Sequence, residues 1–266
     1  MPLPQPTPKS AALITGASSG IGAEIARLLA RRGHGVILVA RREDRLQGLA
    51  TELADTHAVR AEVIACDLTD PEARDDLAAQ VAEGGRRVAI LVNNAGFGSH
   101  GNFVGADTAS EVKMVRLNVE AVTDLLGRFL PPMVDEGEGA VINIASTAAF
   151  QPMPGSATYG GTKAFVLNQG EALNHELRDS GVTVTTVCPG PVKTEFAEVA
   201  GVEEMESDAP EAVLMEPEEI AEAALEAVEQ GKRAVIPGKI NRVGAIAGRL
   251  TPNFLVLPAL ERLWNR

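Results

Sequence analysis

The sequence predicts a single-domain α/β protein: a doubly wound parallel sheet of about seven strands with helices on both faces. Short apolar runs alternate with amphipathic, helix-length stretches along nearly the whole chain, which is the order of β-α-β units. At 266 residues the chain is long enough for one large core. Hydrophobic residues make up 45% of it but aromatic residues only 3%, so we expect aliphatic layers, as in buried parallel strands.

The apolar runs give the strands in order. We predict strands at residues 11–14, 35–40, 60–65, 89–92, 140–145, 182–188 and 234–236. The stretches between them, such as residues 20–32 and 71–83, carry apolar residues at helical spacing and many helix formers. Right-handed crossovers then place helices on both faces of the sheet.

The chain divides into a Pro-rich, flexible lead (residues 1–10), the α/β domain (11–238) and an amphipathic extension (239–266). Within the domain, residues 193–216 mix acidic and apolar side chains after a strand end, which indicates a loop over a ligand site or an ordinary surface excursion. No run is apolar for long enough to span a bilayer, and the lead lacks a signal-peptide core. We expect a cytoplasmic protein.

Charge and cysteine content exclude some classes of function. The net charge of −12 argues against a nucleic-acid partner, because phosphate binding draws on a basic face. Cys66 and Cys188 are far apart and are expected to be buried thiols in a reducing compartment. The four histidines do not cluster, so no metal site is expected.

A glycine-rich turn follows the first strand and opens a helix. Its candidate phosphate-binding residues are Gly16, Ser18, Ser19, Gly20, Ile21 and Gly22. Glycines allow a tight turn, and the free N–H groups at a helix N-terminus bind a pyrophosphate. The G-x-x-x-G-x-G spacing is not that of a P-loop. Alone, such a turn also fits a purely structural role or another Rossmann-type ligand such as S-adenosylmethionine.

Two arginines follow the second strand, where an NAD-specific site has an acidic residue for the ribose hydroxyls. The guanidinium of Arg41 suits a 2′-phosphate in charge and shape. We therefore expect NADP(H) as the cofactor, with NAD(H) less favoured. The alternative is that Arg41 and Arg42 are solvated charges beside Glu43 and Asp44.

A candidate catalytic group lies further along the chain. Ser146 ends a predicted strand, and Tyr159, the only tyrosine, precedes Lys163 by one helical turn. The ordinary tyrosine pKa of about 10 is too high for an efficient base near neutrality. An adjacent ammonium and an oxidised nicotinamide would both favour the phenolate, so we expect a lowered Tyr159 pKa.

Together these motifs resemble the short-chain dehydrogenase/reductase family over about residues 11–236. The ordered set comprises the turn at 15–22, Asp67-Leu68, the Asn-Asn-Ala-Gly run at 93–96, Asn118, Ser146, Tyr159-x-x-x-Lys163 and the Pro-Gly-Pro-Val-Lys-Thr run at 189–194. The resemblance implies a Rossmann-fold oxidoreductase acting on a small carbonyl or alcohol compound. It also implies a homodimer or homotetramer. A cofactor-sensing binding protein without turnover is the alternative.

The resemblance also implies residue roles. Ser146 would polarise the substrate carbonyl and Tyr159 would supply the proton. Lys163 would hold the ribose hydroxyls and lower the Tyr159 pKa. Asn118 would keep a water in a proton relay, or simply cap or bridge backbone groups inside its own helix. The further cofactor contacts would be Asp67 and Leu68 at the adenine, Asn94, Ala95 and Gly96 along the cofactor, and Pro189, Val192 and Thr194 near the nicotinamide.

The substrate wall is expected from three loops after strand ends, and it offers Phe97, Phe103, Phe150, Met153 and Phe196. An apolar substrate follows. Gly160-Gly161 departs from the family pattern, and close approach to the cofactor or a partner helix would explain the pair. The basic, apolar segment 239–266 would cover the cleft, dock on another subunit, contact a membrane surface, or pack on its own domain.

Overall fold

A seven-stranded parallel sheet forms the centre of the protein in the computed structural model, which describes residues 3–201 and 210–264. The strands are β1 (Ser10–Thr15), β2 (Gly35–Ala40), β3 (Ala61–Ala65), β4 (Arg87–Asn93), β5 (Gly139–Ile144), β6 (Val182–Val187) and β7 (Ala234–Val235). Their order is β3-β2-β1-β4-β5-β6-β7, so the chain reverses direction across the sheet between β1 and β4. The predicted fold class is confirmed.

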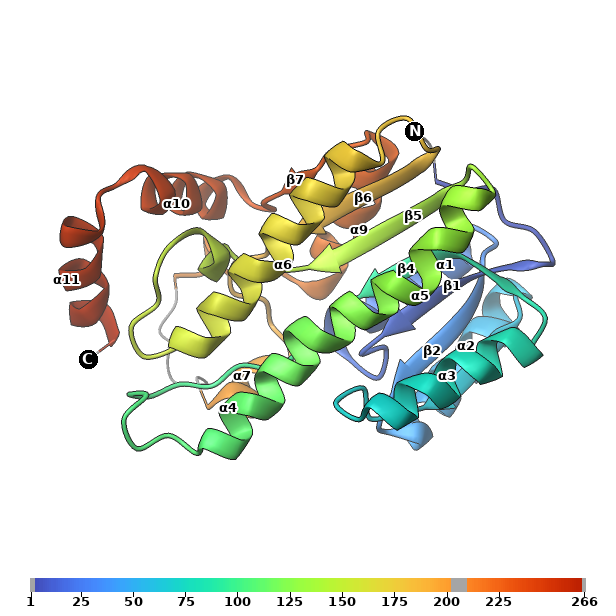
Figure 1. Ribbon diagram of the computed structural model, residues 1–266, viewed down its shortest axis with the longest axis horizontal. Helices are drawn as coiled ribbons and strands as arrows, with labels where there is room; N and C mark the ends of the chain where they lie inside the picture. Colours follow the sequence, from blue (N-terminus) through green and yellow to red (C-terminus); the bar gives the residue numbers. More distant parts are fainter. Residues whose placement is uncertain (1–2, 202–209, 265–266) are drawn as a thin grey trace.

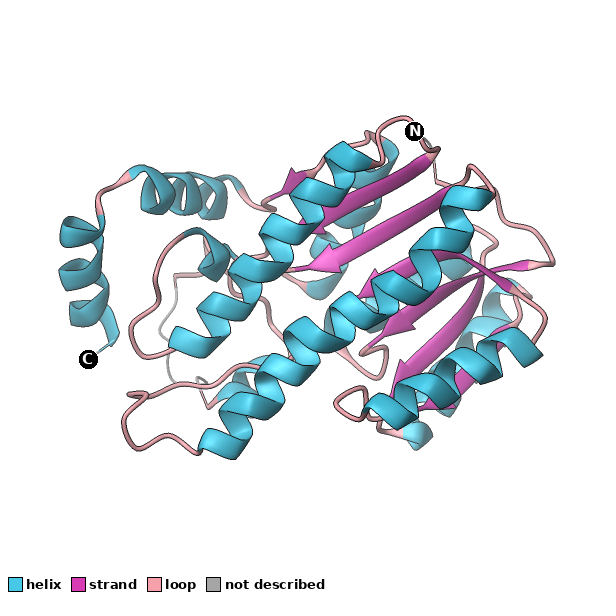
Figure 2. Cartoon of the chain, in the orientation of Figure 1, coloured by secondary structure: helices cyan, strands magenta, loops and turns pink. Residues whose placement is uncertain are grey.

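Helices cover both faces of this sheet (Figures 1 and 2). The larger ones are α1 (Gly20–Arg31), α2 (Glu43–His57), α3 (Pro71–Glu83), α5 (Ala121–Asp135), α6 (Ala157–Glu176) and α9 (Pro217–Glu229). At the carboxyl ends of the strands lie α4 (Thr108–Val115), the π-helical turn η1 (Arg116–Glu120), the 3₁₀ turn η2 (Thr147–Phe150), α7 (Phe196–Ala200), α10 (Lys239–Leu250) and α11 (Asn253–Trp264).

Two aliphatic cores result from the alternation of side chains along each strand. In β1, Ala12 and Ile14 pack in the core shared with α1, α2 and α9. Ala11 and Leu13 point the other way, into the core shared with α3, α5 and α6. The strands β1, β2 and β4 are apolar on both faces in this way, which explains their continuous apolar runs in the sequence.

The ends of the domain differ from the sequence expectation in one respect. Leu3, in the lead expected to be flexible, is 7% exposed and belongs to the first core. The predicted loop 193–216 contains α7, and its residues 202–209 lie outside the described residues. None of the described helices is long and apolar enough to cross a membrane.

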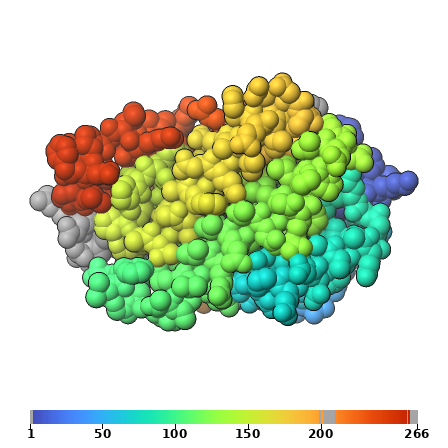
Figure 3. All heavy atoms as spheres, viewed as in Figure 1, coloured from blue at the N-terminus to red at the C-terminus, as the bar shows by residue number. Residues whose placement is uncertain are grey.

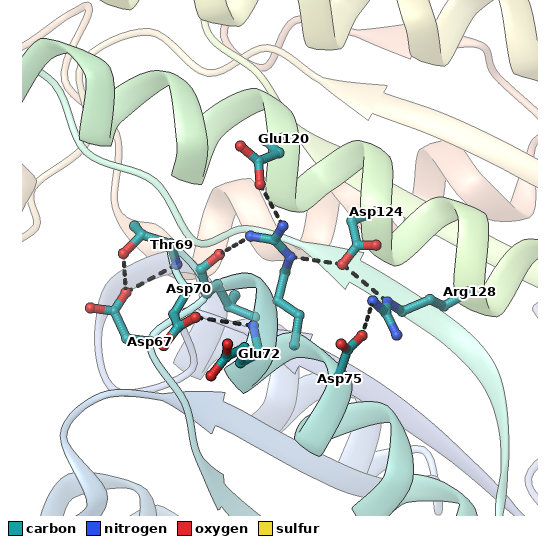
Figure 4. Close-up of polar contacts among 10 residues, drawn as sticks. Asp67, Thr69, Asp70, Glu72, Asp75, Glu120, Asp124 and Arg128 are labelled. Atoms are coloured by element: carbon teal, nitrogen blue, oxygen red, sulfur yellow. Dashed lines mark hydrogen bonds and ion pairs between the residues drawn. The ribbon is translucent and has the colours of Figure 1, made fainter.

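A buried cation fixes the loop after β3. Arg74 on α3 has a side chain only 4% exposed, and its Nη1 donates to the Leu68 carbonyl at 2.8 Å. The same guanidinium bonds Glu120 at 2.6 Å and Asp124 at 2.7 Å, and Arg128 shares Asp124 (Figure 4). Arg74 thereby connects the loop after β3 to η1 and α5.

Replacing Arg74 tests this connection. Arg74→Ala leaves the Leu68 carbonyl and Asp124 without their buried donor, so we expect a loss of about 3 kcal/mol in the free energy of unfolding, measured by urea denaturation. Arg128→Ala removes a more exposed partner of the same carboxylate and should cost about 1 kcal/mol or less. Equal losses of unfolding free energy in the two variants would show that the ion pairs of Arg74 contribute no more than ordinary surface ion pairs.

Candidate active site

One cleft of about 1290 Å³ runs along the carboxyl ends of the strands. It is lined by all the expected catalytic and cofactor-contact residues except Gly22 and Asn118. Ligands of open α/β sheets bind where the strand order reverses, and here that point is the gap between β1 and β4. The topology thus brings residues from loops and helices that are far apart in the sequence to one cavity.

The glycine turn forms the cleft wall beside β1. Gly16 has φ +66°, which glycine adopts without strain. Asn94, after β4, donates from Nδ2 to the Thr15 carbonyl at 2.9 Å. A Cβ on Gly22 would lie 2.5 Å from that nitrogen. Gly22 therefore does not line the cleft but leaves the space in which the Asn94 side chain binds the turn.

Arg42, rather than its neighbour Arg41, makes the closest described contacts with this turn. Its Nη2 donates to the hydroxyls of Ser18 and Ser19, both at 2.9 Å, while Arg41 is exposed at the cleft edge. Arg42 also donates from Nη1 to the carboxylate of Glu195 at 2.7 Å. The sequence analysis nominated Arg41 alone, because contacts between distant loops leave no local signal.

Glu195 brings the segment after β6 to these arginines. Hydrogen bonds from Arg45 and Arg42 hold the pKa of its carboxyl down at about 2. Next to it, the methyl group of Thr194 would lie 3.0 Å from a Cβ on Gly20. Val192 pairs with Met215 in an isolated parallel bridge, so this segment is fixed at both sides of the cleft.

Ser146, Tyr159 and Lys163 meet in the middle of the cleft. Ser146 follows β5 and caps η2, with its Oγ accepting from Ala148 N at 3.1 Å. Its side chain also lies near enough to the Tyr159 hydroxyl to lower the pKa of that phenol. Lys163 lies one turn further along α6, where its Nζ donates to the Ile144 carbonyl at 2.9 Å and lies 5.8 Å from the centre of the Tyr159 ring.

The pKa of Tyr159 differs from the expectation. Burial raises it to about 12, and the nearby Ser146 side chain opposes that shift only in part. Burial also lowers the pKa of Lys163 to about 8. The prediction of a lowered tyrosine pKa is wrong for the protein's own groups, because the cost of desolvating the phenolate outweighs their stabilising contacts.

Asn118 lies in the π-helical turn η1 and is 1% exposed. Its Nδ2 donates to the Phe97 carbonyl at 2.9 Å and to Thr162 Oγ1 at 3.0 Å, and its Oδ1 accepts from Phe97 N at 3.2 Å. The side chain thus joins the loop after β4 to α6. These contacts lie outside its own helix, so they differ from the expected alternative of a cap or bridge within that helix. The water relay stays a prediction.

The two residues expected after β3 lie at one end of the cleft. Leu68 is 4% exposed and lines the cavity. Asp67 accepts hydrogen bonds from Thr69 at 3.0 Å (backbone N) and 2.8 Å (hydroxyl), while Asp70 caps α3. Asp67 thus lines the cleft, where it also pairs with Lys113 at 3.5 Å, and it is not the helix cap.

The opposite end of the cleft is apolar, but its wall is not entirely the one expected. Phe97, Met153 and Phe196 line it, with the Phe196 ring centre 5.5 Å from that of Tyr159. Phe103 is instead 63% exposed, and Phe150 lines a second cavity of about 570 Å³. Residues of α10 complete the wall: Ile240, Asn241, Gly244 and Ala245.

The first glycine of the pair after Tyr159, Gly160, has a local explanation. A Cβ on Gly160 would lie 3.1 Å from Cβ of Met153, whereas one on Gly161 would have no described atom within 4 Å. Gly160 therefore makes room for the Met153 loop. Close approach to the cofactor or to a partner helix is not needed to explain it.

Comparisons with known proteins agree with this geometry. The family model described as short chain dehydrogenase matches residues 10–204. Sulfoacetaldehyde reductase 2 of Chromohalobacter salexigens is 38% identical over 200 residues, which cover 74% of this chain and 79% of that protein.

Two solved structures are similar as well. A short-chain dehydrogenase from Sphingobium yanoikuyae, in complex with NADPH, has a TM-score of 0.81 and 39% identity, covering 90% of this chain and 92% of that one. The bulky-bulky ketone specific alcohol dehydrogenase from Comamonas testosteroni has a TM-score of 0.75 and 36% identity, covering 85% of each chain.

The single phenol allows a direct test of the electrostatics. An ultraviolet titration of tyrosinate in the cofactor-free protein should give a pKa of about 12, and about 10 after unfolding. Because the folded pKa is the higher one, Tyr159 should cost folding stability as the pH rises from 10 toward 12. Tyr159→Phe is the control and should show no such titration. A folded-state pKa below 10 would contradict the burial argument.

Proposed function

The chain belongs to the short-chain dehydrogenase/reductase family of oxidoreductases, and from this premise we propose that it reduces or forms a carbonyl group with NADP(H), using Tyr159 as the proton donor and acceptor. The observation that carries the proposal is the meeting of Ser146, Tyr159 and Lys163 in the cleft that also contains the glycine turn. A binding protein without turnover would not need these three groups together.

The residues of the cleft fit a phosphorylated dinucleotide. The turn at Ser18–Gly20 opens α1, whose N-terminal N–H groups suit a pyrophosphate. At the end of β2, two guanidinium groups face the same cavity, where a 2′-phosphate would need cations. Lys163 and Asn94 to Gly96 would hold the nicotinamide half, with Pro189, Val192 and Thr194 on its other side. The NADPH complex of the Sphingobium relative supports this assignment.

When bound, NADPH supplies the hydride. The protein's own residues would do the rest: Ser146 orients the substrate oxygen, and Tyr159 gives it a proton. The raised pKa of Tyr159 keeps the phenol protonated and ready to donate at neutral pH. In the reverse direction the phenolate must form, and the Lys163 ammonium and the positive charge of the oxidised cofactor would favour it.

Proton supply to Tyr159 is proposed through Lys163 and Asn118. The burial that lowers the pKa of Lys163 to about 8 brings it close to neutrality, where a group both accepts and releases protons readily. Asn118 uses its side chain to hold Phe97 and Thr162. We propose that it keeps a relay water near Lys163 by fixing this part of the wall.

The substrate is proposed to be an apolar ketone or its alcohol. Phe97, Met153, Phe196 and the small residues of α10 give the open end of the cleft an apolar surface. The specificity named for the Comamonas relative, for bulky-bulky ketones, supports a large apolar compound.

We also propose that the protein is located in the cytoplasm and forms a homodimer or homotetramer. The two buried free cysteines fit a reducing compartment.

Removing the phenol hydroxyl tests the mechanism. Tyr159→Phe should lower kcat for ketone reduction by about 10²- to 10⁴-fold, the usual contribution of a positioned acid, as followed by NADPH absorbance. Its NADPH affinity, measured by fluorescence titration, should stay within about threefold, because the ring is retained. A variant with the original kcat would refute the proton-transfer role.

Substituting the arginines tests the cofactor preference. Arg41→Ala and Arg42→Ala should each raise the KM for NADPH about tenfold or more, since a charge-assisted hydrogen bond contributes roughly 1.5–3 kcal/mol. The KM for NADH should rise far less. Arg60→Ala removes an exposed arginine outside the cleft and is the control. Equal effects on both cofactors would refute a 2′-phosphate contact.

A further inference from the structure

Large apolar side chains gather on the outer surface of the two C-terminal helices. The C-terminal apolar patch consists of Ile240, Val243, Ile246, Leu250, Phe254 and Leu255, all among the exposed large hydrophobic residues of the described chain. Val243, Leu250 and Phe254 are 69%, 77% and 74% exposed. Figures 1 and 3 show this segment at one end of the molecule, beyond the carboxyl ends of β5 and β6.

The patch lies on the side of α10 that does not pack on the domain. Asn241 and Ala245 are the buried residues of α10, and a Cβ on Gly248 would lie 1.8 Å from Oε1 of Gln151, so this face contacts the protein. At 100° per residue, Val243, Ile246 and Leu250 project from the opposite side. A helix that served only to cover its domain would be polar there.

The charge of this segment is opposite to that of the rest of the chain. Residues 239–266 contain five basic residues and one acidic residue, which gives them a net charge of +4. Because the whole chain has a net charge of −12, residues 1–238 have a net charge of −16. Lys239, Arg242 and Arg249 are exposed on α10 itself, beside the patch. An apolar strip flanked by cations is complementary to a surface that has an apolar interior beneath an anionic outer layer.

We propose that the C-terminal apolar patch, with Lys239, Arg242 and Arg249, docks this protein peripherally on anionic lipid bilayers. Helices with a strong apolar face and basic flanks lie in the plane of the lipid interface. A second copy is the less favoured occupant. A twofold interface puts the same surface on both subunits, so it would bring the basic residues of one patch against those of the other.

The position of α10 links this surface to the substrate cleft. It lines the cleft through Ile240, Asn241, Gly244 and Ala245, so Ile240 belongs to both the cleft wall and the edge of the patch. A helix is only about 10 Å across. A bilayer at the patch would therefore lie close to the apolar end of the cleft. This step rests on the proposed function: it makes the substrate class an apolar carbonyl or alcohol compound dissolved in lipid.

Vesicle cosedimentation of the full chain tests the docking. Protein should pellet with phosphatidylcholine vesicles that contain about one third phosphatidylglycerol, and at least fivefold less with phosphatidylcholine alone. High salt should weaken binding, because the cationic contribution is screened. Leu250→Glu/Phe254→Glu should reduce binding at least tenfold. Gln47→Glu/Thr51→Glu adds the same charge on the exposed side of α2 and should bind like the unaltered protein.

Each other outcome overturns the docking. Unaltered protein that stays in the supernatant with anionic vesicles, or a patch variant that pellets equally well, refutes it. A patch variant that changes the oligomer size in light scattering, from a parent that does not bind vesicles, assigns the patch to a second copy. Circular dichroism checks that both variants fold. Since no assay here requires turnover, failure would leave the proposed oxidoreductase activity untouched.

Discussion

The hydrogen bonds between Asn94 and the end of β1 hold together the two turns on which the cleft depends. Asn94 N donates to Thr15 Oγ1 at 2.9 Å, and its Nδ2 donates to the Thr15 carbonyl at the same distance. Thr15 in turn donates to the Val92 carbonyl at 3.0 Å. This contact closes the point where the strand order reverses, and so it aligns the glycine turn with the loop that leads to Phe97 and Asn118.

The catalytic groups show the cost of placing ionisable side chains at this reversal. Burial opposes the charged form of both Tyr159 and Lys163, and the protein offsets this cost with few contacts: Ser146 for the phenol and the Ile144 carbonyl for the ammonium. The protein alone therefore favours the neutral phenol. Charges supplied by a bound cofactor have a large effect at such a desolvated site, so we propose that cofactor binding and proton transfer at Tyr159 are coupled.

The strands and the order of the site residues could be predicted because both leave local signals, namely apolar runs and short motifs. The contacts of Arg42 could not, since its partners Ser18 and Glu195 lie in two other loops. Phe150 belonged to a correctly predicted loop, yet it turns away from the cleft and packs beneath Arg249 at 5.9 Å. The Tyr159 pKa was missed because burial is a property of the whole fold.

We propose that hydride passes directly between NADPH and an apolar ketone in this cleft. The most direct measurement is isotope transfer: NADPH carrying deuterium at the reactive C4 position is incubated with the protein and a bulky apolar ketone, and the alcohol is analysed by mass spectrometry and NMR. We predict one deuterium on the carbinol carbon, from one face of the nicotinamide only. Alcohol without deuterium from either C4-labelled form, or no alcohol across a panel of such ketones, would contradict the account.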